Sequence, residues 1–91
     1  MTDPTFVPVE HIVATQLEGG EGVLVDLDTR QYYQLNETAM LIWRALEKGS
    51  QFSQIVDELM ATYAVSNERA IASAETLLKH LQERKLVRPT A

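Results

Sequence analysis

One stretch of the chain, Gly22 to Trp43, constrains the fold more than any other. Val23 to Leu27 is rich in valine and leucine and has the alternating faces of a β-strand. A short polar turn, Asp28 to Arg30, leads to a second strand, Gln31 to Leu35. Asn36 then begins a helix, since its side-chain oxygen can accept an amide of the first turn. Strand, turn, strand and helix in such close order predict a small α+β fold.

The strand from Gln31 to Leu35 has none of the residues that usually prevent an exposed edge from pairing with another strand. It contains two tyrosines and two glutamines, with neither charge nor proline. Soluble proteins usually protect an exposed strand edge, because unpaired backbone groups invite another strand. Peptide capture by strand addition is a functional use of such an edge. The backbone of residues 31–35 would do the pairing, so no special side-chain chemistry is needed.

Composition excludes several classes of function. A chain of 91 residues forms one small domain with little room for a deep catalytic cleft. Its net charge of −5 argues against nucleic acid as the main partner, since a phosphate backbone demands a positive footprint. The sequence has no cysteine, which excludes disulfides, cysteine-ligated zinc and a thiol nucleophile.

The sequence also lacks signals for a membrane or for export. No apolar run approaches the roughly 18 residues of a membrane span. Met1 to Pro8 carries two prolines, one aspartate and no basic segment, so we expect no signal peptide. We therefore expect a cytoplasmic protein with no membrane partner.

Periodicity predicts three strands followed by three helices. Short turns imply an antiparallel meander with Val23 to Leu27 in the middle. Asn36 and Ser66 are expected to cap the first and third helices, and Gly49 to end the first. We expect residues 1–10 to be a flexible N-terminal arm and residues 11–88 to form the domain. The remaining predicted elements are the strands 11–17 and 31–35, a second helix over 52–63 and a third over 67–84, with Leu86 and Val87 packed against the core.

The chain resembles the PqqD-like family of peptide-recognition domains. The resemblance rests on Leu24 to Thr29, Tyr32 to Ala39, and Ile42-Trp43, and it covers residues 11 to 87. These domains are also called RiPP recognition elements, because they serve pathways of ribosomally made, modified peptides. Arg30 departs from the glycine common in the family, so we expect either a small backbone strain there or a different turn. Gln51 replaces the usual Ser or Thr cap, so we expect the second helix to start nearer Ser50.

The resemblance implies a winged helix-turn-helix-like domain, with a three-stranded antiparallel sheet followed by three helices. It implies a non-catalytic adaptor that captures the leader of a precursor peptide as an extra strand and presents it to a modifying enzyme, such as a radical enzyme or a leader peptidase. The leader would lie between the third strand and the third helix. The peptide-binding residues expected there are Arg30, Gln31, Tyr32, Tyr33, Gln34, Leu35, Arg69, Ala70, Ser73 and Leu77.

Several of these residues also have a simpler interpretation. Tyr32 and Tyr33 are common strand residues that pack sheets. Ala70, Ser73 and Leu77 also fit a widened core stripe on the third helix. Arg69, Lys79 and Arg84 are ordinary solvated charges one by one, although together they could steer an acidic leader.

Other residues that could carry chemistry have structural explanations. Trp43 shares a helix face with Ile42 and is expected in the core. Asp26 and Asp28 share a strand face, but a turn in which Asp28 bonds the backbone two residues on explains them better than acid–base catalysis. His11 and His80 have no further ligand at a suitable spacing. We therefore predict no catalytic residue, no metal and no cofactor.

Two other functions remain open on the sequence alone. The order of elements also permits a winged-helix DNA-binding module, although the third helix has nearly balanced charge. Alternatively, the third strand could pair with its own copy in a homodimeric assembly subunit.

Overall fold

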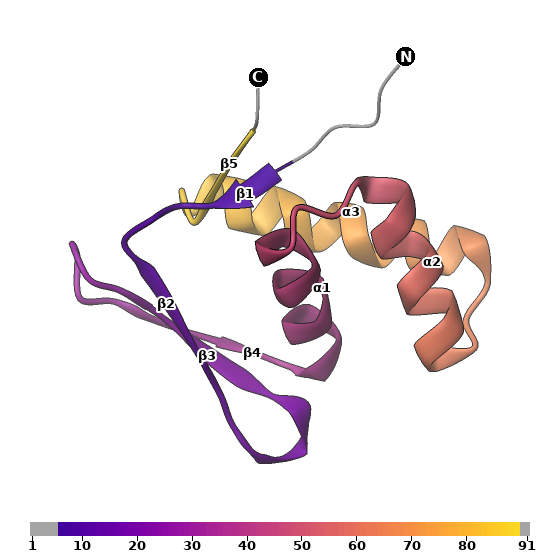
Figure 1. Ribbon diagram of the computed structural model, residues 1–91, viewed down its shortest axis with the longest axis horizontal. Helices are drawn as coiled ribbons and strands as arrows, with labels where there is room; N and C mark the ends of the chain where they lie inside the picture. The colour runs from indigo at the N-terminus through magenta and orange to yellow at the C-terminus, as the bar shows by residue number, and fades with distance from the viewer. Residues whose placement is uncertain (1–5, 90–91) are drawn as a thin grey trace.

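The computed structural model of the chain describes residues 6–89. Figure 1 shows the main sheet on one side of the molecule, α1 beside it and α2 beyond α1, while α3 runs behind α1 from the side of α2 to β5. A second, two-stranded sheet joins the two ends of the described chain. The elements are β1 (Phe6–Pro8), β2 (Ile12–Gln16), a short 3-10 turn (Glu18–Gly20), β3 (Gly22–Asp26), β4 (Tyr32–Leu35), α1 (Glu37–Glu47), α2 (Phe52–Tyr63), α3 (Asn67–Glu83) and β5 (Val87–Pro89).

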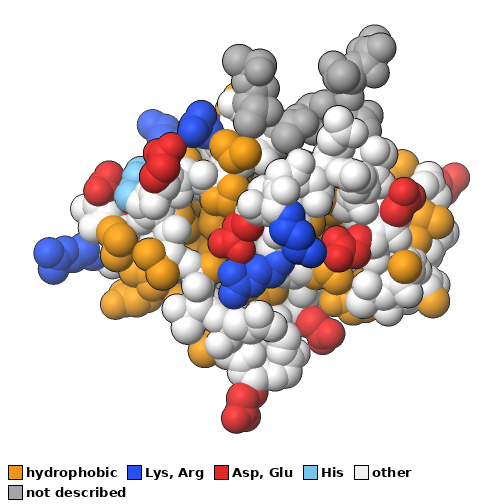
Figure 2. All heavy atoms as spheres, in the orientation of Figure 1, with side chains coloured by type: hydrophobic (Ala, Val, Ile, Leu, Met, Phe, Trp, Pro, Cys, Tyr) orange, Lys and Arg blue, Asp and Glu red, His pale blue; other side chains and the backbone are white. Residues whose placement is uncertain are grey.

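The α+β order predicted from the sequence is confirmed. The main sheet is antiparallel in the order β2-β3-β4, with β3 in the middle. Leu24 on β3 is fully buried and lies opposite Ala14 on β2 and Tyr33 on β4. In Figure 1 none of the helices in the described part of the chain covers the other face of the main sheet, and Figure 2 shows hydrophobic side chains on the same side of the molecule as the sheet. The exposed large hydrophobic residues are Val13, Leu17, Leu27 and Tyr32.

α1 and α3 begin at the capping residues predicted from the sequence. The Ala39 N–H donates to Asn36 Oδ1 at 2.8 Å, and the Arg69 N–H donates to Ser66 Oγ at 3.2 Å. These side chains satisfy amides that a helix leaves without a backbone partner. The expectation that α2 would start nearer Ser50 was wrong. Gln51 is its N-cap, and the Gln51 N–H donates to Gln54 Oε1 at 2.8 Å, which fixes the start.

The core lies between the sheet and the helices. Trp43 is fully buried, as predicted, and its indole Nε1–H donates to Glu47 Oε2 at 3.2 Å. Leu86 and Val87 are also buried, as expected for a C-terminal segment packed against the core. None of the helices formed by residues 6–89 has the length and apolar character needed to cross a membrane.

The N-terminal segment differs from the expected arm within the described residues. Phe6–Pro8 forms β1 and pairs antiparallel with β5, Val87–Pro89. The Val9 N–H donates to the Leu86 carbonyl at 3.0 Å, and Arg88 contacts Glu10 at 3.0 Å. Strand pairing therefore orders residues 6–8, whereas residues 1–5 of the expected arm lie outside the described residues.

Candidate peptide-binding groove

β4 is an edge strand, and its outer backbone groups face away from the sheet. Within residues 6–89 it pairs only with β3. The Asp26 N–H donates to the Gln31 carbonyl at 2.9 Å. Hydrogen-bonding direction alternates along an antiparallel strand, so the amides and carbonyls of Tyr33 and Leu35 also point at β3. Those of Tyr32 and Gln34 therefore point outward, where an added strand could bind them.

The side chains of β4 alternate between the face that packs on the helices and the outer face of the sheet. Leu35 is buried and belongs to the core. Tyr33 is half-buried and packs against the core, and its hydroxyl donates to Gln31 Oε1 at 2.7 Å. Tyr32 is 73% exposed on the outer face. The two tyrosines thus have different environments, as their alternate positions predict.

A hollow of about 380 Å³ lies between β4 and α3. From β4 it is lined by Tyr32 to Leu35, and from the other side mainly by the C-terminal half of α3. Leu81 and Leu86, which are nearly fully buried, supply apolar surface there. The helical residues and the chain that follows them contribute Leu77, His80, Leu81, Arg84 and Leu86.

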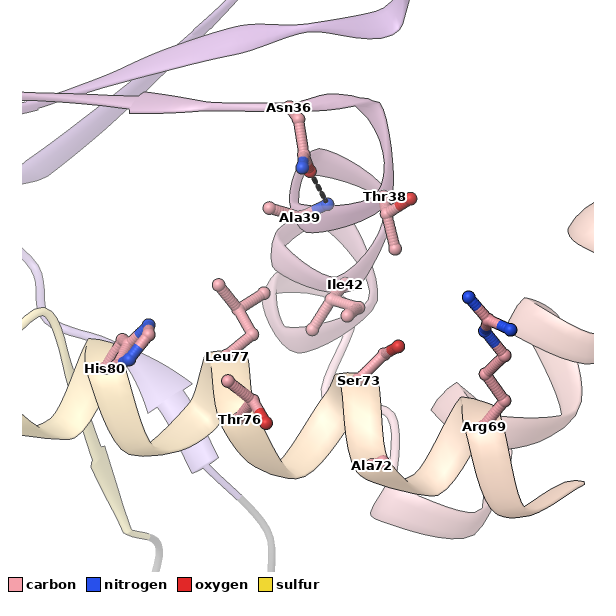
Figure 3. Close-up of a pocket in the computed structure, with 10 residues that line it drawn as sticks. All are labelled: Asn36, Thr38, Ala39, Ile42, Arg69, Ala72, Ser73, Thr76, Leu77 and His80. Carbon is pink, nitrogen blue, oxygen red and sulfur yellow. Dashed lines mark hydrogen bonds between the residues drawn. The ribbon is translucent and has the colours of Figure 1, made fainter.

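A larger hollow of about 530 Å³ continues beyond the end of β4, between α1 and α3. Leu77 and His80 line both hollows, so the two form one groove along α3. Figure 3 shows Ile42 of α1 and Leu77 of α3 pointing toward each other, with Arg69 and His80 at opposite ends. The lining residues are Asn36, Thr38, Ala39, Ile42, Arg69, Ala72, Ser73, Thr76, Leu77 and His80.

The structure brings most of the predicted site residues to this groove. Tyr32, Tyr33, Gln34 and Leu35 line its first part, and Arg69, Ser73 and Leu77 line its second, with Leu77 common to both. Three predicted residues lie elsewhere. Ala70 is 1% exposed and lines neither part of the groove; it lines an adjoining hollow of about 250 Å³ toward α2, which shares Thr38, Arg69 and Ser73 with the groove. Arg30 and Gln31 belong to the β3–β4 turn and line neither part of the groove.

Sequence reasoning missed the contribution of α1 and, on α3, that of Ala72, Thr76 and His80. Thr38, Ala39 and Ile42 were read as helix residues with no role at the site. The spacing of four, three, four and four residues from Arg69 through Ser73, Thr76 and His80 to Arg84, the C-cap residue of α3, places all five on one side of the helix. That spacing was readable in the sequence and could have found them.

The β3–β4 turn holds β4 in place, and its geometry corrects one prediction. Asp26, not Asp28, makes the side-chain bonds of the turn. Asp26 Oδ1 accepts the N–H of Asp28 at 2.9 Å and that of Thr29 at 3.2 Å. Arg30 has φ 63°, so the strain expected from a residue in a glycine position is present. The sequence could not distinguish the two aspartates, because both precede suitable amides.

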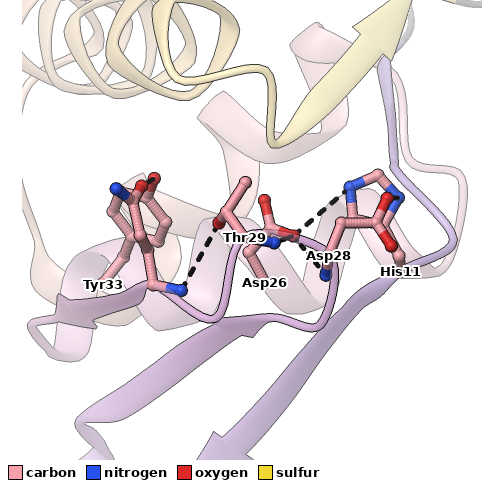
Figure 4. Close-up of polar contacts among 6 residues, drawn as sticks. His11, Asp26, Asp28, Thr29 and Tyr33 are labelled. Atoms are coloured by element: carbon pink, nitrogen blue, oxygen red, sulfur yellow. Dashed lines mark hydrogen bonds and ion pairs between the residues drawn. The ribbon is translucent and has the colours of Figure 1, made fainter.

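Asp26 is 6% exposed and ionises readily for a buried carboxyl. Burial raises its pKa, but the N–H groups of Thr29 and Asp28, with His11 nearby, outweigh burial and hold the pKa below its usual range. Figure 4 shows His11 beside both aspartates; its ring nitrogens lie 3.5 Å from Asp26 Oδ1 and from Asp28 Oδ2. Among residues 6–89, no three acidic or histidine side chains are grouped as a metal site would require.

Comparison with known proteins identifies the family. The sequence model of coenzyme PQQ synthesis protein D (PqqD) matches residues 21–87. The chain belongs to the PqqD family. The match spans β3 to the start of β5 and so contains both walls of the groove. Among curated proteins, none matches the chain.

Two solved structures share this PqqD-family fold closely. One is TbiB1 in complex with the TbiA(beta) leader peptide, with a TM-score of 0.85 and 27% identity over 93% of this chain and 98% of that one. The other is lasso peptide synthetase B1 complexed with the leader peptide, with a TM-score of 0.82 and 30% identity over 92% and 98%. Each match covers more than nine-tenths of this chain, so the shared fold extends beyond the residues matched by the family model.

Proposed function

We propose that this chain is a leader-peptide-binding adaptor of a pathway that makes modified ribosomal peptides. The leader of a precursor adds to β4 as a further strand, and its inward side chains enter the groove beside α3. The observation that carries the proposal is the outward-facing backbone of Tyr32 and Gln34, directly beside a partly apolar hollow of about 380 Å³. The two similar structures, both of complexes with leader peptides, support it.

The adaptor has no catalytic step of its own. Its groove contains hydroxyl, amide, aliphatic and basic side chains and no carboxylate or thiol. Such a surface suits reversible binding, in which the adaptor keeps the leader extended and presents the rest of the precursor to a separate modifying enzyme, a radical enzyme or a leader peptidase. Strand addition supplies affinity through the backbone, and the groove supplies specificity through alternate side chains.

Binding to the leader of a short precursor encoded beside the gene tests the proposal. With ¹⁵N-labelled protein, we expect the amide shifts to concentrate on residues 31–35 and 69–84. The neighbouring modifying enzyme should convert the precursor faster with this chain than without it. Shifts confined to β2 or to α2, or conversion that ignores the chain, would refute the adaptor.

Two controls separate the adaptor from its rivals. Duplex DNA binding that falls steeply with salt would favour a winged-helix DNA-binding module. Sedimentation of the free protein tests the homodimer, because a dimer formed through β4 would bury the edge and compete with the leader.

A further inference from the structure

The groove is free of acidic residues in a chain that is acidic overall. The chain has 13 acidic and 8 basic residues, yet none of the residues that line the two hollows is Asp or Glu. Its charged residues are Arg69 near α1 and Arg84 near β4. Among residues 6–89, neither arginine has a carboxylate within ion-pair distance. Both cations are thus available to a ligand.

The acids of α3 lie off the groove. Glu68, Glu75 and Glu83 line neither hollow, and Glu75 instead faces a hollow of about 380 Å³ beside Phe6, which Lys79 also lines. Lys79 therefore does not belong with Arg69 and Arg84, contrary to the grouping made from sequence. With a net charge of −5, the protein as a whole repels acidic peptides, whereas the groove attracts them.

The two arginines stand at a spacing that an extended peptide can match. They are 15 residues apart on one side of α3, which corresponds to about 22 Å along a helix axis. A strand advances about 3.3 Å per residue, so six residues span about 20 Å. Six is an even number, so residues i and i+6 of a strand point to the same face. One peptide can thus place two carboxylates in the groove at both arginines.

The geometry points to a specific ligand class: an extended segment with acidic residues at positions i and i+6 and apolar residues at i+2 and i+4. The inward residues between the acids meet Leu77 together with the buried Ile42 and Leu81. This inference rests on the proposed strand addition to β4. The pattern reads the same in both chain directions, so it applies whichever way the segment runs.

Selection from a yeast-displayed library of random 12-residue segments tests the pattern. On the wild-type protein we expect enriched segments to carry Asp or Glu pairs at a spacing of six. On Arg84→Glu we expect one acidic position to change to Lys or Arg, and on Arg69→Glu the other. Lys79→Glu makes the same charge change on α3 outside the groove, so its selection should match that of the wild type.

The affinity of one enriched segment, made as a synthetic peptide, supplies a second measurement. Changing either acid to Gln should weaken binding about two- to fivefold at low salt, since exposed ion pairs are modest. The loss should shrink in 0.5 M salt, where the charges are screened.

The outcomes separate this inference from the proposed function. Two outcomes would overturn the inference and leave the proposed function standing. In the first, enriched segments shift the amides of β4 but lack the acidic pair. In the second, the acidic pair is kept in segments selected on both arginine variants. If no segment is enriched, or if enriched segments leave the amides of β4 unshifted, strand capture fails and the inference fails with it.

Discussion

The two edges of the main sheet are alike in sequence and different in surroundings. β2 (Ile12–Gln16) and β4 (Tyr32–Leu35) are both short, and neither contains a charge or a proline. Leu27 donates its N–H to the His11 carbonyl at 3.0 Å, and Leu17 donates to that of Glu21 at 2.7 Å. By alternation, Ala14 and Gln16 turn their backbone groups away from β3, as Tyr32 and Gln34 do on the other side.

Only β4 has α3 beside it. The groove between β4 and α3 is lined on both sides, whereas β2 lies at the opposite edge with β3 in between. β2 also has one outer group engaged, since the Ile12 N–H donates to the Val9 carbonyl at 3.1 Å. An unpaired strand edge is thus a common property that gives no selectivity. The helical wall beside β4 distinguishes the edge that we propose as the binding site.

Proline substitution at the outer amides gives the largest expected effect. Gln34→Pro removes an N–H that points away from β3, so the sheet keeps its own bonds while the incoming strand loses a donor. We expect leader affinity to fall at least about thirtyfold, or roughly 2 kcal/mol, from the lost hydrogen bond and the clash of the ring. Calorimetric titration with the leader peptide measures it.

Ala14→Pro is the matched control on the other edge. It removes an outward N–H of β2 in the same way, and we expect leader affinity to change less than about twofold. Circular dichroism should show that both variants fold. Equal losses in the two variants would mean that the edges are equivalent and that α3 does not define the site.

Trimming the wall of the groove should have a smaller effect. Leu77 is half-buried and contributes to both hollows. Leu77→Ala should lower leader affinity about five- to tenfold, or roughly 1–1.5 kcal/mol, because part of a leucine contact is lost. Leu17→Ala, beside β2, removes the same atoms from a residue that is 44% exposed and should leave affinity unchanged. An equal loss in both variants would argue against the groove.

The difference between local and long-range interactions explains how much of the fold could be predicted from the sequence. The helix caps Asn36 and Ser66 were predictable because capping depends on a few neighbouring residues. β1 and β5 were not, because each has three residues and their pairing joins the ends of the chain. Short strands have too few residues for a periodic pattern, and long-range pairing leaves no local signal.

The candidate site also has one part that was predictable from local sequence and another that depends on helix packing. The unguarded edge of β4 was visible as an uncharged run, since strand pairing needs only the backbone. The part of the groove formed by Thr38 and Ile42 was not, because it depends on how α1 packs beside α3. Ala70 was placed in the site by helical spacing, but its position toward α2 buries it.

The turn between β3 and β4, which precedes the proposed binding edge, gives the smallest expected effect. β4 follows the turn organised by Asp26, whose pKa is held below its usual range by backbone N–H groups and His11 against the effect of burial. A carboxyl with a lowered pKa in the folded state stabilises the protein above its ordinary pKa of about 4, and this contribution is lost as pH falls through the lower, folded value. Asp26→Asn keeps an oxygen acceptor but removes the charge. The difference in unfolding free energy between the wild type and Asp26→Asn should therefore be largest near neutral pH and shrink below about pH 4.

Urea unfolding at a series of pH values measures this difference. Asp28→Asn is the control, because Asp28 lies at the same distance from the His11 ring but its side chain is 72% exposed. The unfolding free energy of Asp28→Asn should stay closer to that of the wild type at each pH, since an exposed ion pair contributes little to stability. If Asp26→Asn and the wild type lose stability in parallel on acidification, the charge of Asp26 does not support the turn. The position of β4 relative to β3 would then depend on the backbone conformation of the turn alone, including the positive φ of Arg30.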